Sequence, residues 1–335
     1  MQRFFDFQES FHHYYQRLEQ RFTVPYEILL TPAQIPSAYK TSGTADLSSI
    51  GAVLWDVYGT LCGMDLGDLD KTLEHDEHLL RAARATIAEF SLEEPLSLMR
   101  TEPDQPSENT LRDLYLQMID DSHLRSLADG IRYPEVLIEQ IWLQILLECT
   151  KHGLQLPQNE PPLHTAYRCA CFFDWSLQHI YLYPHTGEAL ETLKKAGIIQ
   201  GIISNAQFYT PLHLRRLLRE DRGRDDLELE DYFSEPAVLF SYEMGFSKPN
   251  PGAFRRALAF LRQQGIAPEQ VLFIGNDMLK DIWAADQCGM KTMLFAGDSR
   301  QTVLQENEPL CRDLQPDAVV TDMNQIAELI LEHLK

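Results

Sequence analysis

Four short groups of polar residues in this sequence carry side chains that could do chemistry together. They are Asp56 after the run GAVLW, Ser204 after IIQGII, Lys248 in the segment SKPNP, and Asn276-Asp277 with Asp281 after VLFIG. Carboxylates can act as nucleophiles or as oxygen ligands for Mg²⁺, a lysine ammonium offsets negative charge, and a hydroxyl donates a hydrogen bond. These residue types can cooperate only if the fold brings the four groups to one place.

Short apolar runs alternate with helix-like segments along most of the chain. The runs are 51–55, 198–204, 237–241, 271–275, 292–297 and 318–322, and the helix-like segments between them are 186–197, 211–220, 251–265 and 281–289. This alternation predicts an α/β fold whose core is a Rossmann-like parallel sheet covered by helices on both faces. Ligands of such sheets bind at the carboxyl ends of the strands. Asp56, Ser204 and Asn276-Asp277 all follow predicted strands, so they could line one crevice.

The chain is long enough for more than one domain. Residues 65–177 contain no strand-like run and instead show helical periodicity, which predicts a helical cap inserted into the sheet domain. The sheet domain then consists of residues 49–64 and 178–335. Residues 1–48 read as an N-terminal helix, over 3–22, followed by an irregular arm rich in Pro, Ser and Thr.

Composition and charge narrow the classes of partner. The 335 residues include 29 basic and 50 acidic side chains, and the formal net charge of −21 disfavours nucleic-acid backbones and anionic membrane surfaces. No apolar run reaches the roughly 20 residues that span a bilayer, and the N-terminus does not resemble a secretory signal. We therefore expect a cytoplasmic protein that acts on a small-molecule substrate. The oligomeric state does not follow from the sequence.

The polar groups resemble the four motifs of the haloacid dehalogenase-like (HAD) hydrolase superfamily. The matching segments are DVYGTL (56–61), ISN (203–205), SKPNP (247–251) and GNDMLKD (275–281), in the order of the family's motifs and each in the expected strand context. The resemblance covers residues 51 to about 330. It implies an α/β hydrolase, and it places the insert where the family has its type-1 helical cap.

The resemblance also implies a role for each conserved type of side chain. Asp56 would be the nucleophile and form a covalent aspartyl intermediate. Ser204 would donate a hydrogen bond to the transferred group, and Lys248 would neutralise the nucleophile and that group. Thr60 and Asn205 would contact the substrate.

The fourth motif and the first would together bind Mg²⁺, with Asp56, Tyr58, Asn276, Asp277 and Asp281 as candidate ligands. Two alignments of the fourth motif are open: Asp277 with Asp281, or Asn276 with Asp281. We prefer Asp277 as the direct ligand and Asp281 as an outer partner. The alternative for Asp281 is an acid that complements the N-terminal end of a helix.

Tyr58 departs from the family's phosphatases, in which a second Asp at this position protonates the leaving group and activates water. A tyrosine hydroxyl can donate a hydrogen bond but is a poor base near pH 7. The form DxYGT instead resembles the metal-independent 2-haloacid dehalogenases. Three functions follow: Mg²⁺-dependent hydrolysis of a small phosphorylated substrate, which we favour; dehalogenase-type hydrolysis without a metal; and a non-catalytic binding protein.

Overall fold

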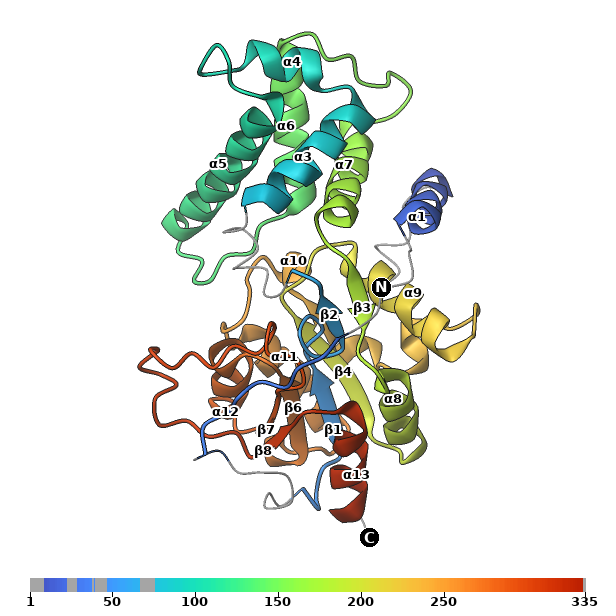
Figure 1. Ribbon diagram of the computed structural model, residues 1–335. Coiled ribbons are helices and arrows are strands. Elements are labelled where there is room, and N and C mark those ends of the chain that lie inside the picture. The colour runs from blue at the N-terminus through green and yellow to red at the C-terminus, as the bar shows by residue number, and fades with distance from the viewer. Residues whose placement is uncertain (1–8, 23–28, 38, 40–46, 67–75, 334–335) are drawn as a thin grey trace. The chain divides into compact units, whose positions relative to one another are not determined.

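The computed structural model describes residues 9–22, 29–37, 39, 47–66 and 76–333 of the chain (Figure 1). The chain forms two compact units, one of residues 1–27 and 69–179 and the other of residues 28–68 and 180–335. The sequence-based division set residues 1–48 apart as an N-terminal helix and an irregular arm. In the structure, the helix α1 (Glu9–Phe22) belongs to the same compact unit as the helical insert.

The larger unit contains a six-stranded sheet in which all neighbouring strands are parallel. Its order is β5-β4-β1-β6-β7-β8, made of β1 (Ala52–Trp55), β4 (Ile199–Ser204), β5 (Val238–Phe240), β6 (Val271–Gly275), β7 (Lys291–Phe295) and β8 (Ala318–Val320). Trp55 lies opposite Ile202 of β4 and Ile274 of β6. The prediction of a parallel sheet is confirmed, and the strand before Asp56 lies between the strand that ends at Ser204 and the strand that ends at Gly275.

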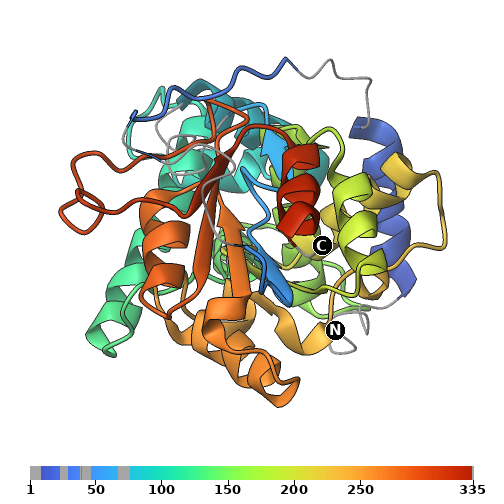
Figure 2. The same cartoon turned by 90° about the horizontal axis from the view of Figure 1, so that it is seen from below.

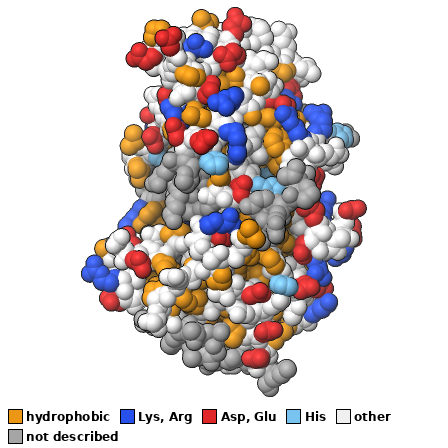
Figure 3. Space-filling view, viewed as in Figure 1, with side chains coloured by type: hydrophobic (Ala, Val, Ile, Leu, Met, Phe, Trp, Pro, Cys, Tyr) orange, Lys and Arg blue, Asp and Glu red, His pale blue; other side chains and the backbone are white. Residues whose placement is uncertain are grey.

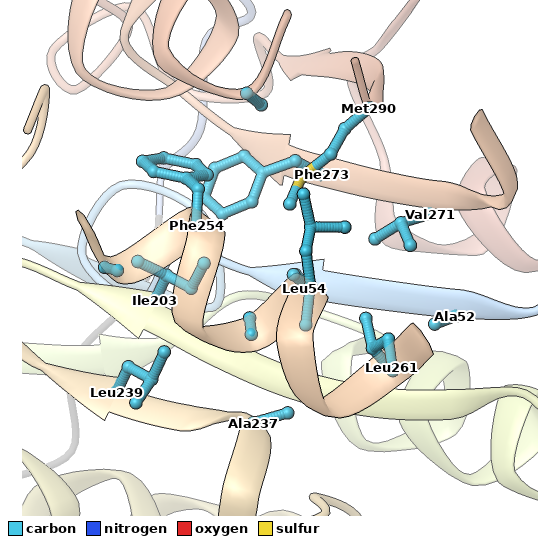
Figure 4. Packing of buried hydrophobic residues seen from close by; sticks show 14 of the residues in the cluster. Ala52, Leu54, Ile203, Ala237, Leu239, Phe254, Leu261, Val271, Phe273 and Met290 are labelled. Atoms are coloured by element: carbon cyan, nitrogen blue, oxygen red, sulfur yellow. The ribbon is translucent and has the colours of Figure 1, made fainter. Parts of the chain in front are cut away.

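Helices cover both faces of this sheet, as the apolar character of the strands requires. They are α8 (Thr186–Lys195), α9 (Thr210–Arg222), α10 (Ser241–Met244), α11 (Gly252–Gln263), α12 (Ala284–Asp286) and α13 (Met323–His333). Helices α8 and α13 lie side by side (Figure 2). On the α11 side, Phe254 and Leu261 pack against Leu54 and Phe273, the core shown in Figure 4. This packing fixes β1, and with it the position of Asp56.

Two elements of the larger unit differ from the sequence-based prediction. A π-helix, η4 (Met278–Trp283), precedes α12 and begins earlier than the predicted helix at 281. A second, antiparallel sheet pairs β2 (Cys62–Met64) with β3 (Ile180–Leu182). Strands of three residues are too short to show alternation, so the sequence does not reveal them. They flank the chain positions at which the helical insert begins and ends.

The smaller unit consists of α1, α3 (Asp76–Phe90), α4 (Glu93–Leu98), α5 (Ser107–Ala128), α6 (Ile138–Lys151) and α7 (Pro162–Leu177). Its core is aromatic: the rings of Tyr115, Trp142 and Phe173 lie within 5.0–5.8 Å of one another. Helix α1 packs on α7, where Tyr15 meets Trp175 edge to face. Aromatic spacing on α1 is therefore explained by packing.

Part of the N-terminal segment runs along the larger unit. The backbone amide of Ala33 donates to Ala296 O at 2.9 Å, and Ser299 N donates to Thr31 O at 2.7 Å. Ala33 and Ile35 pack against an apolar cluster next to β7. The segment thus covers apolar surface beside the sheet.

No helix in the described part of the chain has the length and apolar character needed to cross a membrane. On the face shown in Figure 3, acidic and basic side chains are intermixed. The local charge therefore varies over this face, although the net charge of the chain is −21.

Candidate active site

Asp56 lies directly beyond β1, at the start of a tight turn. Its backbone amide donates to Ile274 O at 2.9 Å, which extends the pairing of β1 with β6 by one bond. The turn is closed by bonds from Gly59 N to Cys62 O and from Leu61 N to Val57 O. Gly59 has φ +83°, and a Cβ there would lie 2.2 Å from Asn276 Nδ2. Both the backbone conformation and the space therefore require glycine at this position.

Lys248 joins two carboxylates at the centre of the site. Its Nζ lies 2.7 Å from Asp56 Oδ1 and 2.5 Å from Asp281 Oδ1, and all three side chains are buried. Burial raises the pKa of Asp56, and the charge of Lys248 opposes that rise. Burial alone would lower the pKa of Lys248, but Asp281 and Asp56 raise it above its ordinary value. The ammonium therefore stays charged and offsets one of two negative charges.

Asn205 holds the backbone of Lys248. Its Oδ1 accepts from Lys248 N at 2.7 Å, and its Nδ2 donates to Lys248 O at 3.2 Å. Both ends of the amide are thus used to orient the lysine, whereas the resemblance implied a contact with substrate.

Ser204 ends β4 next to Asp56, and its hydroxyl is buried and donates to Asn205 O at 3.4 Å. This bond is long, so the hydroxyl can turn to a better acceptor.

Asp281 is fixed by the backbone of the fourth motif. Its Oδ2 accepts from Asn276 N and Asp277 N, each at 3.0 Å, while Oδ1 faces Lys248. A Cβ at Gly275 would lie 2.3 Å from Asp281 Cγ, so glycine makes room for this carboxylate. Asp281 therefore shapes the loop after β6 and anchors Lys248.

Asp277 caps the π-helix that follows it. Its Oδ1 accepts from Leu279 N at 2.7 Å and from Lys280 N at 2.8 Å, and Gln305 Nε2 lies 3.2 Å from Oδ2. Among the described residues, no three His, Cys, Asp or Glu side chains form a group that could hold a metal ion. The expectation from the sequence that Asp56, Asp277 and Asp281 bind Mg²⁺ together stays a prediction.

Asn276 lies beside the turn of residues 56–62, which follows β1. Its Nδ2 donates to Gln301 O at 2.7 Å, and its Oδ1 accepts from Thr60 Oγ1 at 3.2 Å. The carbonyl of Gln301 can only accept, so these bonds fix which end of the amide faces Thr60. For a divalent cation, the donors facing this turn are the Asp56 carboxylate and Asn276 Oδ1. One carboxylate and one amide oxygen suit Mg²⁺ only when water and substrate oxygens complete its shell.

Tyr58 is half-buried and tied to the start of α9. Its hydroxyl lies 2.9 Å from Thr210 Oγ1, which also accepts from Gln207 N at 3.2 Å. Because the Gln207 amide is a donor only, the Thr210 hydroxyl has its own proton free to give to Tyr58, or can accept the phenol proton. Tyr58 is thus held as a hydrogen-bonding group.

The comparison with known families agrees with this geometry. The model of the haloacid dehalogenase-like hydrolases matches residues 50–289, well over half of the chain. The chain belongs to this family. The protein is therefore a hydrolase.

Relatives of this HAD-like hydrolase include two archaeal proteins named glyceraldehyde 3-phosphate phosphatase. The one from Pyrococcus furiosus is 30% identical over 44% of this chain and 53% of its own length, and the one from Methanopyrus kandleri is 27% identical over 52% and 67%. The chain thus spans about half to two thirds of these relatives. A solved 2-haloacid dehalogenase from Pseudomonas syringae pv. tomato shares the fold, with a TM-score of 0.51 and 20% identity over 84% of this chain and 99% of that one.

Two residues of the site had no signal in the sequence. Gln301 and Thr210 contact Asn276 and Tyr58 respectively, yet neither lies in a motif. Gln301 stands in an irregular segment after β7, and Thr210 begins α9. Only the spatial neighbours of the motif residues reveal them.

A prediction about stability follows from the burial of Asp277. Burial and the charge of Asp281 raise the pKa of Asp277 from 3.8 to about 6. A raised folded-state pKa means that the folded protein binds more protons than the unfolded chain in this pH range. The free energy of unfolding that protonated Asp277 contributes is therefore lost as pH rises from about 4 to 6. The loss is on the order of 3 kcal/mol. Asn caps helices about as well as Asp, so we expect Asp277→Asn to be more stable than the parent at pH 7 and nearly equal to it at pH 4.

Urea unfolding of both proteins across this pH range measures the difference. Asp225→Asn is the matched control, because Asp225 is exposed and belongs to the same unit. An Asp277→Asn protein that is less stable at pH 7 would contradict the prediction. A loss of Mg²⁺ binding in this variant would instead identify Asp277 as a metal ligand.

Proposed function

We propose that this hydrolase cleaves a small phosphorylated molecule through a covalent intermediate on Asp56. The observation that carries the proposal is the buried pair in which Lys248 Nζ lies 2.7 Å from Asp56 Oδ1 at the end of the central strand. The charge of Lys248 opposes the rise in the pKa of Asp56 that burial causes, and the pair holds the carboxylate in one orientation, as a nucleophile requires. The phosphatase names of the curated relatives support the same substrate class.

In the first step, an Asp56 oxygen attacks phosphorus, and the bond from phosphorus to the ester oxygen breaks. Lys248 offsets the charge of the phosphoryl oxygens, and the Ser204 hydroxyl donates to one of them. The departing alkoxide takes a proton from water, and the Tyr58 hydroxyl, near the turn that follows Asp56, could stabilise it with a hydrogen bond. The product of this step is an aspartyl phosphate.

Asp56 and Asn276 Oδ1 are the residues that would hold Mg²⁺ here. When bound, the cation would supply positive charge to the phosphoryl oxygens. Since this chain offers one carboxylate and one amide, we expect binding in the millimolar range that strengthens with substrate present. Asp277 as the direct ligand, which the sequence led us to prefer, stays an alternative prediction.

In the second step, water attacks phosphorus and releases Asp56. No carboxylate stands at position 58 to take the proton of that water, and the tyrosine hydroxyl is a poor base near pH 7. We therefore expect hydrolysis of the aspartyl phosphate to limit turnover.

Tyr58→Asp tests this limit. The variant restores a base at the nucleophile turn, and general-base help contributes about 10²–10⁴-fold where the geometry is right. We expect at least the lower end of this range in kcat for p-nitrophenyl phosphate. Rapid-quench kinetics should show a burst in the parent and its loss in the variant.

Tyr58→Asn is the matched control, because it opens the same space and loses the same bond to Thr210 without adding a base. Equal acceleration in both variants would mean that space, and not proton transfer, limits the parent. Slower turnover in Tyr58→Asp than in Tyr58→Asn would exclude the proposed role of position 58.

A second candidate function is hydrolysis of a carbon–halogen bond, in which Asp56 attacks carbon and halide leaves. Tyr58 and the neutral Asn276 favour it, since both positions lack a carboxylate that would attract a metal. Against it stands Asp281, which adds a second buried negative charge near Asp56 and, without a bound cation, would repel the carboxylate of a 2-haloacid.

A substrate screen separates the candidates. The purified protein is incubated with phosphate esters and with 2-chloropropionate, each with Mg²⁺ and with EDTA. We expect phosphate release that Mg²⁺ increases, and no halide release. Halide release that is insensitive to EDTA would establish the dehalogenase-type reaction, and no release from either class would favour the non-catalytic alternative.

Cytoplasmic location remains a prediction that fractionation of cells would check.

A further inference from the structure

Residues 298–303 form a loop that lies along the fourth motif. Val303 N donates to Asn276 O at 3.0 Å, and Met278 N donates to Val303 O at 2.9 Å. The loop is therefore paired by its backbone with the segment that carries Asn276.

Gln301 in this loop makes two contacts in different directions, and it is buried, with 1% of its surface exposed. Its side-chain Nε2 donates to Met64 O of β2 at 2.6 Å. Its backbone carbonyl accepts from Asn276 Nδ2 at 2.7 Å. One residue thus joins β2 to the amide that faces Thr60 in the nucleophile turn.

Asp298 fixes the same loop to β3. Its buried carboxylate accepts from the hydroxyls of Tyr181 at 3.0 Å and Tyr183 at 3.3 Å, and it pairs with Arg300. Arg300 also donates to the Tyr181 hydroxyl at 2.7 Å. The Asp298 carbonyl then accepts from Gln301 N at 3.1 Å, so the anchor on β3 also holds Gln301 in place.

Strands β2 and β3 are the segments through which the insert of residues 69–179 is joined to the larger unit. The loop holds both strands and, through Gln301, the Asn276 amide. We propose that Gln301 is a positioning residue: it ties the strand that leads into the helical insert to Asn276, and so keeps the nucleophile turn in its reactive arrangement. The effect on turnover rests on the proposed role of Asp56. The hydrogen bond that joins β2 to the loop does not rest on it.

Gln301→Met tests the tie because it keeps the length of the side chain and removes the donor to Met64 O. A net hydrogen bond contributes about 0.5–1.5 kcal/mol, so we expect the backbone amides of β2 and β3 to exchange hydrogen up to about tenfold faster. Gln264→Met is the matched control, since Gln264 is exposed in the same unit. Unchanged exchange in Gln301→Met would overturn the proposal.

Turnover of p-nitrophenyl phosphate tests whether Gln301 acts on the site through Asn276. A small misplacement near reacting groups lowers rates by up to about 10²-fold, and we expect Gln301→Met to lower kcat about tenfold with KM nearly unchanged. In an Asn276→Ala background the same change should lower kcat less than about twofold, because the hydrogen bond between Asn276 and Gln301 O is already absent. The same factor in both backgrounds would show a merely structural role and refute the positioning role.

Two further cases are a Gln301→Met variant that does not fold and a parent protein without phosphatase activity. If Gln301→Met does not fold, Tyr181→Phe removes one anchoring hydroxyl and should raise exchange in β3; unchanged exchange there would count against the tie. If the parent hydrolyses no phosphate ester, the proposed function fails, and the exchange measurement alone decides whether the loop ties β2.

Discussion

Asp56→Asn should abolish turnover while leaving the fold intact. The amide oxygen is a far weaker nucleophile than a carboxylate, and loss of a covalent nucleophile lowers kcat by at least about 10³-fold. The change also removes one of the two carboxylates around Lys248, whose Nζ keeps Asp281 Oδ1 at 2.5 Å. The remaining pair is neutral, so we expect the urea midpoint to stay equal or rise.

Steady-state kinetics with p-nitrophenyl phosphate, and mass spectrometry of acid-quenched parent, measure this prediction. The parent should carry a phosphoryl group on the peptide that contains Asp56, and the variant should carry none. Asp225→Asn controls for the loss of one negative charge at an exposed position. Substantial turnover in Asp56→Asn, or a phosphoryl group on another residue, would exclude Asp56 as the nucleophile.

Lys248→Met should lower stability as well as rate. It leaves the buried carboxylates of Asp56 and Asp281 without a cation, and breaking a buried pair costs about 3–5 kcal/mol. We also expect kcat to fall about 10²–10³-fold, because the charge that faces the transferred group is gone.

The loss of stability in Lys248→Met should grow as pH rises. Without Lys248, burial and the charge of Asp281 raise the folded-state pKa of Asp56 further above its unfolded value. Stability is then present at low pH and is lost as pH rises, so Lys248→Met should be closer to the parent at pH 5 than at pH 8. Urea unfolding at both pH values checks this.

Lys248→Met with Asp281→Asn separates the two roles of the lysine. Removing one carboxylate should recover part of the stability and none of the activity. Equal loss of stability in the single and double variants would mean that packing of the lysine side chain, and not its charge, stabilises the site.

The sequence by itself determined the sheet and the place of Asp56. Apolar runs such as 51–55 and 271–275 are buried on both faces, and this pattern together with the alternating helices specifies a parallel sheet. A residue that follows a central strand must then lie at the ligand-binding edge, which places Asp56 and Ser204. The segment SKPNP resembles the family's third motif, and the structure brings its Lys248 to Asp56.

Only the tertiary structure shows which groups the residues of the fourth motif contact. Asn276 and Asp277 are adjacent in the chain, but the start of a helix at Met278 turns the Asp277 carboxylate to its own backbone amides and leaves the Asn276 amide facing Thr60. Sequence spacing could not choose between them, because the choice depends on where the helix begins. The role of Gln301 was also hidden, since hydrogen bonds between segments distant in the chain depend on the packed fold and leave no local pattern.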